Sequence, residues 1–226
     1  MKDLNSIRFD YDKRESRHIV WDTWEKAIPF NELNYKINDI KRMLKINNAI
    51  RLYIVDPEYY QLGPINAAVT INYETILIGL TSDLYDLLDD DEIDFVLGHE
   101  IGHALFNHIG IEKDPFSIEN LFKEISADRV GYIVCNDMSK ISSSLYKLDV
   151  GYISRYKKIG IKELLGHKYL PSSTHPNLSL RIDALLKFSL SKKYKNFIGE
   201  TNYAFNDKQL EESIYKDLVN SYDPFL

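Results

Sequence analysis

The sequence is poor in several features that mark particular classes of protein. Cys135 is the only cysteine among 226 residues, which excludes an intrachain disulfide. No stretch approaches the roughly 18 consecutive apolar residues that a membrane-spanning helix needs, and the first residues lack the apolar run of a signal peptide. Basic residues are not in excess either, because the formal net charge is −6, and this argues against a general nucleic-acid binder. We therefore expect a cytoplasmic protein without an integral membrane segment.

The chain also lacks internal repeats and low-complexity linkers, which suits a single domain with at most an appendage. Its 44% hydrophobic and 27% charged residues are typical of a globular protein that buries a real core. We expect residues 1–48 to form an N-terminal arm and a helix within the main domain. Residues 49–196 would form the body of that domain, and residues 197–226 would form a C-terminal helical tail.

Hydrophobic patterning predicts a small β-sheet followed by helices. Residues 50–55 alternate like a strand, and residues 66–71 and 75–79 form two further candidate strands. The turn residues 72–74 predict a hairpin, and residues 157–176 are expected to be rich in loops. Apolar stripes and capping residues predict helices over residues 32–47, 82–88, 89–107, 118–135, 140–156, 177–195 and 207–221. The predicted fold class is therefore α+β, mainly helical, with a small three-stranded β-sheet.

One pentapeptide, His99-Glu100-Ile101-Gly102-His103, matches the HExxH motif of zinc proteases. Residues at i and i+4 lie on one face of a helix, about one turn apart, so both imidazoles can bind one metal ion. Glu100 lies beside them and can serve as the general base for a metal-bound water. The sequence therefore predicts a metal site on the helix over residues 89–107, with His99 and His103 as two of its ligands.

A catalytic zinc site needs a third protein ligand and one open position for water. One alternative is a histidine six residues after His103, accompanied by a glycine three residues after His103. Ile109 and Phe106 occupy these two positions, so this alternative fails. His108 would lie roughly 180° around a continuous helix from His99, at about 3.6 residues per turn. We therefore expect His108 to be a surface or core histidine and not a ligand.

A glutamate on the following helix is the better candidate for the third ligand. Glu124 lies in the middle of that helix, so an antiparallel return of the chain can bring it to the metal. Asp128 lies one turn further on the same face and can accept a hydrogen bond from the outer nitrogen of a ligand histidine. Glu112 in the preceding loop and Glu119 in the first turn are rivals, although dipole compensation explains Glu119. The spacing favours Glu124.

The order of these motifs, HExxH followed by ExxAD, resembles the gluzincin zinc metallopeptidases of the HtpX and CAAX prenyl protease type. The resemblance covers roughly residues 50–190 and implies a zincin-like metallopeptidase domain over residues 49–196 with an HExxH active-site helix. Three further elements support it: Val55-Asp56-Pro57 and then Asn66-Ala67 before a hairpin, an acidic run within residues 84–97, and Ser173-Thr174-His175-Pro176 with Arg181.

The resemblance implies a site with one zinc ion per chain. The zinc ligands would be His99, His103 and Glu124, and Glu100 would be the catalytic base. Asp128 would be an outer carboxylate that orients a ligand histidine.

The same resemblance implies roles for residues that the sequence alone leaves open. His175 would lie near the metal, either stabilising the oxyanion or occupying the open zinc position. Arg181 would support the floor of the active site, and Asn66 and Ala67 would lie on the sheet edge that holds the substrate backbone. Without the resemblance, the sequence favours a loop histidine at 175 ordered by Pro176, and it leaves Arg181 equally open to an ordinary ion pair.

Together these features predict a zinc-dependent metalloendopeptidase that acts on proteins or peptides. The alternative is a catalytically silent or latent zinc-binding regulatory protein whose site is closed by His175. The intact Glu100 counts against that alternative, since a purely structural site has no need for a base. An exopeptidase would additionally need charged groups that hold a substrate terminus, and the sequence does not identify them.

Overall fold

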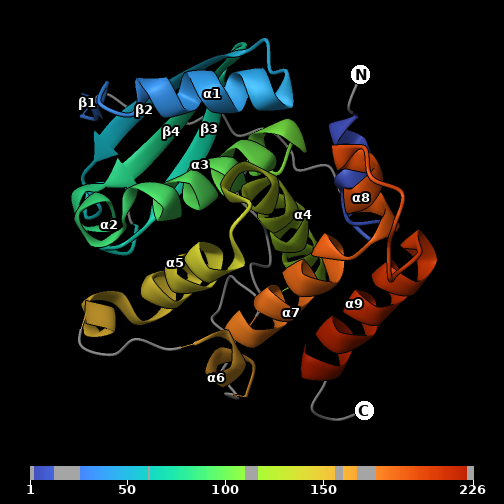
Figure 1. The fold of residues 1–226 in the computed structure, drawn as a ribbon. Coiled ribbons are helices and arrows are strands. Elements are labelled where there is room, and N and C mark those ends of the chain that lie inside the picture. The colour runs from blue at the N-terminus through green and yellow to red at the C-terminus, as the bar shows by residue number, and fades with distance from the viewer. Residues whose placement is uncertain are drawn as a thin grey trace.

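The computed structural model describes residues 3–12, 26–60, 62–109, 117–155, 160–166 and 177–222. Figure 1 shows a small sheet on one side of the molecule, with α1 (Asn34–Leu44) lying along it, and a group of helices that fills the other side. The further helices are α2 (Ser82–Leu87), α3 (Asp90–Leu105), α4 (Ile118–Cys135), α5 (Met138–Val150), α6 (Ile161–Gly166), α7 (Leu178–Ser189), α8 (Lys192–Ile198), α9 (Asp207–Tyr222) and the 3-10 helices η1 (Leu4–Ile7) and η2 (Gly151–Arg155).

The sheet is mixed, and the described residues form four strands of it in the order β1-β2-β4-β3. These are β1 (Ile28–Pro29), β2 (Ala49–Val55), β3 (Ala67–Asn72) and β4 (Thr75–Thr81). β2 and β4 are parallel, whereas β1 and β3 pair antiparallel with their neighbours. The prediction of three strands was therefore one strand short. A strand of two residues that includes a proline is too short to show an alternating pattern, and proline is tolerated there because β1 is an edge strand.

The start of α3 is fixed by its own sequence. Asp89 accepts hydrogen bonds from the N–H groups of Asp91 and Glu92, and the Glu92 side chain accepts one from the Asp89 N–H at 2.7 Å. This reciprocal capping box satisfies amide groups that a helix start leaves without intrahelical partners. Lys147 of α5 pairs with Glu92 at 2.7 Å, so this end of α3 is also tied to the helical side of the molecule.

One prediction in the second half of the chain was wrong. Residues 177–195 form two helices, α7 and α8, because Ser191 stops the first and caps the second by accepting a hydrogen bond from the Tyr194 N–H at 3.2 Å. An apolar stripe does not report such a cap. Within residues 157–176, which were predicted to be rich in loops, the described residues include the short helix α6.

The N-terminal segment, defined here as residues 3–12, is packed into the molecule. Its Ile7 and Phe9 side chains are 0% and 1% exposed. Arg129 of α4 donates a hydrogen bond to the Ile7 carbonyl at 3.0 Å and pairs with Glu211 of α9 at 2.9 Å. The segment therefore joins the α4 helix to the last helix of the chain.

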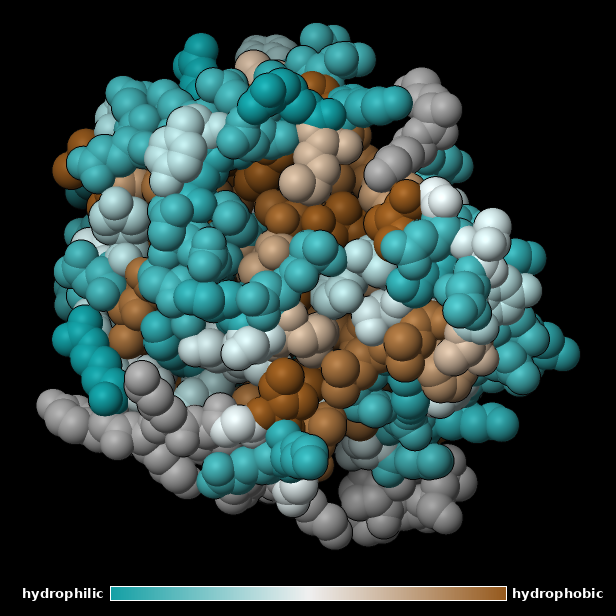
Figure 2. Space-filling view, viewed as in Figure 1, coloured by the Kyte–Doolittle hydropathy of each residue, from teal (hydrophilic) through white to brown (hydrophobic). Residues whose placement is uncertain are grey.

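The face of the molecule seen in Figure 2 is mostly hydrophilic at its rim, with apolar side chains gathered through its centre. Within the parts of the chain that the structure describes, no helix combines the length and the apolar character needed to cross a membrane.

Helices α3 and α4 approach each other at backbone contact. A Cβ added to Gly98 would lie 2.8 Å from the Gly131 Cα, and one added to Gly102 would lie 2.9 Å from the Ala127 Cα. The contacts move toward the C-terminus on α3 as they move toward the N-terminus on α4, so the two helices run antiparallel. Because the small residues allow this close approach, longer side chains on the facing surfaces of α3 and α4 can contact one another.

This close approach leads to a first prediction. Gly98→Ala is expected to lower the free energy of unfolding by about 1–3 kcal/mol, because the added methyl forces the two helix backbones apart. Gly160→Ala is the matched control, since a Cβ there meets nothing within 4 Å. The midpoints of urea unfolding check the pair, and equal midpoints for both variants would contradict the packing argument.

Candidate metal centre

Three side chains with metal-binding chemistry converge between α3 and α4. The Nε2 atoms of His99 and His103 are 3.0 Å apart. Glu124 places Oε2 3.4 Å from the His99 Nε2 and Oε1 3.3 Å from the His103 Nε2. One possible ligand atom from each of the three lies within 4.8 Å of the others. The structure therefore brings together the three residues that the sequence predicts as metal ligands.

The local structure explains this convergence. His99 and His103 are one turn apart on α3, so their rings point from the same face of the helix. Glu124 and Asp128 have the same spacing on α4. Because the helices are antiparallel and in backbone contact, each pair meets the other across the interface. The outcome is an ordered pairing of His99 with Asp128 and of His103 with Glu124.

Asp128 determines which nitrogen of His99 faces the other two side chains. Its Oδ1 lies 2.9 Å from the His99 Nδ1, and the carboxylate is fully buried. Burial opposes ionisation of Asp128, but Arg181 and His99 outweigh it and lower the pKa of the carboxyl below its usual value. An ionised carboxylate can only accept, so His99 donates from Nδ1, and Nε2 is the nitrogen that would bind a metal ion.

Arg181 of α7 lies behind Asp128. Its Nε donates to Oδ2 at 2.8 Å and its Nη2 donates to Oδ1 at 2.5 Å, which is a bidentate pair. The same Nη2 is 4.0 Å from Glu124 Oε2. Arg181 is thus brought to the rear of the group, in contact with the carboxylate that orients His99.

The centre has a strongly negative surrounding. Burial disfavours a charged imidazole at His99, yet the hydrogen bonds to Asp128 and Glu124 outweigh it and raise the pKa of His99 to about 10. A positive charge at this point is therefore favoured by the two carboxylates. A metal cation would satisfy the same electrostatic demand.

Glu100 lies on α3 next to these side chains and is buried. Burial raises the pKa of its carboxyl, while the neighbouring imidazoles of His99 and His103 act in the opposite direction. Its carboxylate does not belong to the converging group found among the described residues. Glu100 is thus a buried acid next to the centre, and its carboxylate is not one of the three candidate ligands.

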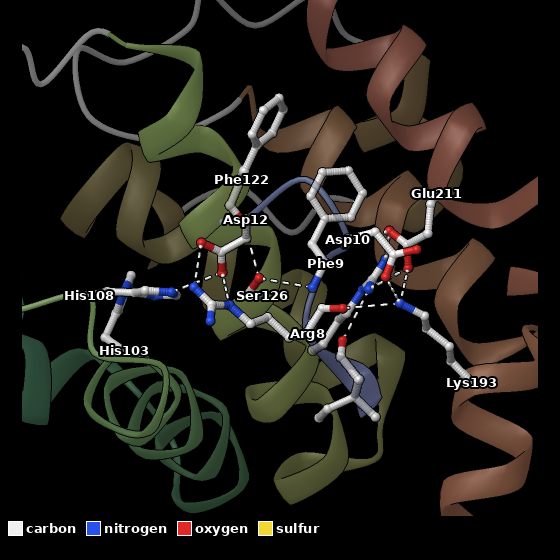
Figure 3. A network of polar contacts seen from close by, with 12 residues as sticks. Arg8, Phe9, Asp10, Asp12, His103, His108, Phe122, Ser126, Lys193 and Glu211 are labelled. Carbon is white, nitrogen blue, oxygen red and sulfur yellow. Dashed lines mark hydrogen bonds and ion pairs between the residues drawn. The ribbon is translucent and has the colours of Figure 1, made fainter. Parts of the chain in front are cut away.

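The outer nitrogen of His103 contacts another histidine. Its Nδ1 is 3.1 Å from the Nδ1 of His108, whose Nε2 is 2.9 Å from Asp12 Oδ2 (Figure 3). The sequence reasoning missed this contact because it placed His108 on a continuous helix. α3 ends at Leu105, and Asn107 adopts a left-handed φ of 58°, which turns the chain back toward His103.

Both members of this outer pair have shifted pKa values. Burial lowers the pKa of His108 to about 4, against the hydrogen bond to Asp12. Burial would raise the pKa of Asp12, but hydrogen bonds from His108 and Arg8 lower it to about 2. At neutral pH the pair therefore consists of a neutral imidazole and a carboxylate. No sequence pattern pointed to Asp12, which is 96 positions from His108.

Asn66 and Ala67 lie at the beginning of the edge strand β3. The Asn66 carbonyl accepts from the Thr81 N–H at 3.1 Å, so the backbone of Asn66 faces β4. The Ala67 N–H instead donates to the Asn66 side chain at 2.8 Å and faces the edge of β3 with which no strand of the described residues pairs. By the alternation of an antiparallel pair, Val69 and Ile71 also direct backbone groups to that edge.

His175, its neighbour Pro176 and the rival Glu112 lie outside the described residues. Glu119 is in the first turn of α4, where the helix dipole favours an acid.

The single cysteine is a different feature from the centre. Cys135 is the last residue of α4, about three turns after Glu124. Burial raises the pKa of its thiol to about 11. We expect alkylation by iodoacetamide at pH 8 to be slower in the folded protein than in guanidinium, because the reactive thiolate fraction is about 100-fold smaller. Equal rates in the two conditions would show that the thiol is not held in this way.

Comparison with known proteins yields one match. The family model described as peptidase family M48 matches residues 51–114, which include β2, β3, β4, α2 and α3. No curated protein and no solved structure matches the chain. The matched segment ends before α4 and so contains His99, Glu100 and His103 but not Glu124. The segment that carries strands β2 to β4 and the HExxH helix is therefore similar to peptidase family M48.

Proposed function

We propose that this protein is a zinc-dependent metalloendopeptidase. The observation that carries the proposal is the convergence of two imidazole Nε2 atoms and one carboxylate beside a buried glutamate that is not part of the converging group. The family match supports a metallopeptidase in general. We assign the activity to residues 49–196, with the N-terminal residues 1–48 as part of the same domain and residues 197–226 as its helical tail.

The donor set fits zinc. Two imidazole nitrogens and one carboxylate oxygen are a ligand set that catalytic zinc sites use, and they leave a fourth position for water or substrate. The side chains of His99, His103 and Glu124 keep between 9% and 15% of their surface exposed, so the centre is not sealed from solvent. A purely structural site would be closed by a fourth protein ligand.

The chain's own residues then supply the proton chemistry. Bound zinc would polarise the scissile carbonyl and acidify the attacking water. Glu100 would take a proton from that water on a carboxylate oxygen and pass it to the nitrogen of the leaving amine. Burial of Glu100 raises its pKa, which brings the carboxyl closer to the range of an effective acid and base near neutral pH.

The edge of β3 supports the choice of an endopeptidase. An extended peptide can add to a free strand edge through backbone hydrogen bonds, which makes no demand on either peptide terminus. We assign this role to the edge that begins at Asn66 and Ala67 and continues through Val69 and Ile71. Arg181 would act through Asp128 on His99, and the predicted catalytic role of His175 remains a proposal from the sequence.

The experiment that tests the proposal is digestion of a diverse peptide library, read by mass spectrometry, with protein loaded with zinc and with protein stripped by a chelator. Internal cuts that require zinc and return when zinc is restored support an endopeptidase. Cuts confined to peptide termini would replace it with an exopeptidase. A zinc-loaded protein that cuts nothing would favour the silent protein closed by His175.

A further inference from the structure

The two histidines of the centre are held from behind in different ways. His99 contacts a carboxylate directly, through Asp128 at 2.9 Å. His103 reaches a carboxylate only through a second imidazole, His108, which contacts Asp12 at 2.9 Å. The contact to Asp12 brings the N-terminal segment into the surroundings of the centre, as Figure 3 shows.

Hydrogen-bond chemistry gives the tautomers of His108 and His103 when both imidazoles are neutral. The Asp12 carboxylate can only accept, so His108 donates from Nε2 and is left with a lone pair on Nδ1. That lone pair accepts the proton of the His103 Nδ1, 3.1 Å away. His103 is then left with its lone pair on Nε2, which is the atom facing His99 and Glu124. The arrangement fixes the tautomer that a metal ligand needs.

The outer pair is a built part of the structure. The side chains of Asp12 and His108 are both 0% exposed. Arg8 donates to Asp12 from Nε at 3.1 Å and from Nη2 at 3.3 Å, which holds the carboxylate in place. The Phe9 N–H donates to Ser126 Oγ at 3.1 Å, so the segment is also pinned to α4 between the positions of Glu124 and Asp128.

The N-terminal segment has a second anchor, Lys193 of α8, which contacts it two and four residues before Asp12. Lys193 pairs with Asp10 at 2.6 Å and with Glu211 of α9 at 2.7 Å, and it donates to the Arg8 carbonyl at 3.1 Å. This anchor holds the segment without touching His108 or Asp12. It therefore offers a way to loosen the segment while leaving the contact to His103 intact.

We infer that Asp12 and His108 are positioning residues for the metal centre, and that the N-terminal segment is part of the metal site through them. The inference rests on the proposed function, because it concerns the same centre, but it requires metal binding and not peptide cleavage. Outer partners of metal-bound histidines contribute about 10- to 100-fold to metal affinity. We expect Asp12 and His108 to contribute a factor of this size to the zinc affinity of the protein.

The test measures zinc affinity of the full chain by competition with a chromophoric chelator, and the absorption spectrum of the cobalt-substituted protein. His108→Phe removes both ring nitrogens and is expected to weaken zinc binding about 10- to 100-fold. His108→Asn keeps a side-chain oxygen that can accept from His103, so its affinity should lie between His108→Phe and wild type. Asp12→Asn should also bind zinc more weakly than wild type, because a neutral amide no longer fixes the tautomer of His108.

Lys193→Met is the matched control, since it disturbs the same segment at its other anchor. It is expected to lower the melting temperature but to keep wild-type zinc affinity and an unchanged cobalt spectrum. Wild-type affinity in His108→Phe and Asp12→Asn would overturn the inference, and so would an equal loss in Lys193→Met. A wild-type protein that binds no zinc would overturn both this inference and the proposed function. The expected ranking in a protein that cuts no peptide would support the inference while the proposed peptidase fails.

Discussion

Glu100→Gln is expected to keep metal binding and to reduce peptide cleavage by about 100- to 10,000-fold. Glutamine has nearly the same shape as glutamate but cannot take a proton from water at neutral pH. The carboxylate of Glu100 is not one of the three converging ligand groups, so its replacement leaves the metal ligands in place. The measurement combines mass spectrometry of a digested peptide library with the zinc content of the purified variant.

Glu92→Gln is the matched control for this experiment. Glu92 is also a buried glutamate of α3, but it serves the capping box and pairs with Lys147 at 2.7 Å. Its replacement should cost some stability and leave the cleavage rate near that of wild type. A Glu100→Gln variant with wild-type activity would rule out Glu100 as the general base. A variant that also loses its zinc would show that the carboxylate holds the metal instead.

Local geometry explains why much of the centre could be predicted from the sequence. The i, i+4 spacing places His99 and His103 on one face of any helix, whatever the rest of the fold does. Glu124 and Asp128 have the same spacing on the next helix, and one connection between the helices leaves an antiparallel return as the simple arrangement. Predicting these members of the group therefore required only the two helices and their order in the chain.

The outer partners of His103 could not be predicted in that way. Asp12 reaches the centre through tertiary packing of the N-terminal segment, and no periodicity links it to His108. His108 itself was assigned by angle on a helix that in fact stops at Leu105. A helix end is determined by a single left-handed residue, here Asn107, and such residues are poorly marked by apolar patterning.

In the fold, too, features set by local sequence were predicted and features set by tertiary packing were not. β2 was predicted because its alternation over several residues signals a half-buried strand, and β3 and β4 were predicted as candidate strands on either side of the turn residues 72–74. β1 was missed because its pairing with β2 is decided by residues far apart in the chain, Ile28 with Ile54 and Pro29 with Tyr53. The general class, mainly helical with a small sheet, survives such errors because it depends on the long periodic segments.

Arg181→Met is expected to lower the free energy of unfolding by about 3–5 kcal/mol, because it leaves the buried Asp128 carboxylate without its bidentate partner. The pKa of Asp128, which Arg181 holds low, should rise toward its usual value or above it. A protonated Asp128 is a weaker acceptor for the His99 Nδ1–H, so zinc affinity should fall as well. Urea unfolding of the metal-free protein and zinc competition measure the two effects separately.

Arg129→Met separates the loss of a buried ion pair from the loss of an orienting group. Arg129 is fully buried, pairs with Glu211 at 2.9 Å and donates a hydrogen bond to the Ile7 carbonyl at 3.0 Å. Its removal should also lower the free energy of unfolding, because Glu211 loses one of its two cationic partners and keeps only Lys193 at 2.7 Å. Zinc affinity that falls in Arg181→Met but not in Arg129→Met would assign Arg181 to the orientation of His99 through Asp128. Equal zinc affinity in the two variants would reduce Arg181 to an ordinary buried ion pair, which is the role that the sequence alone left open.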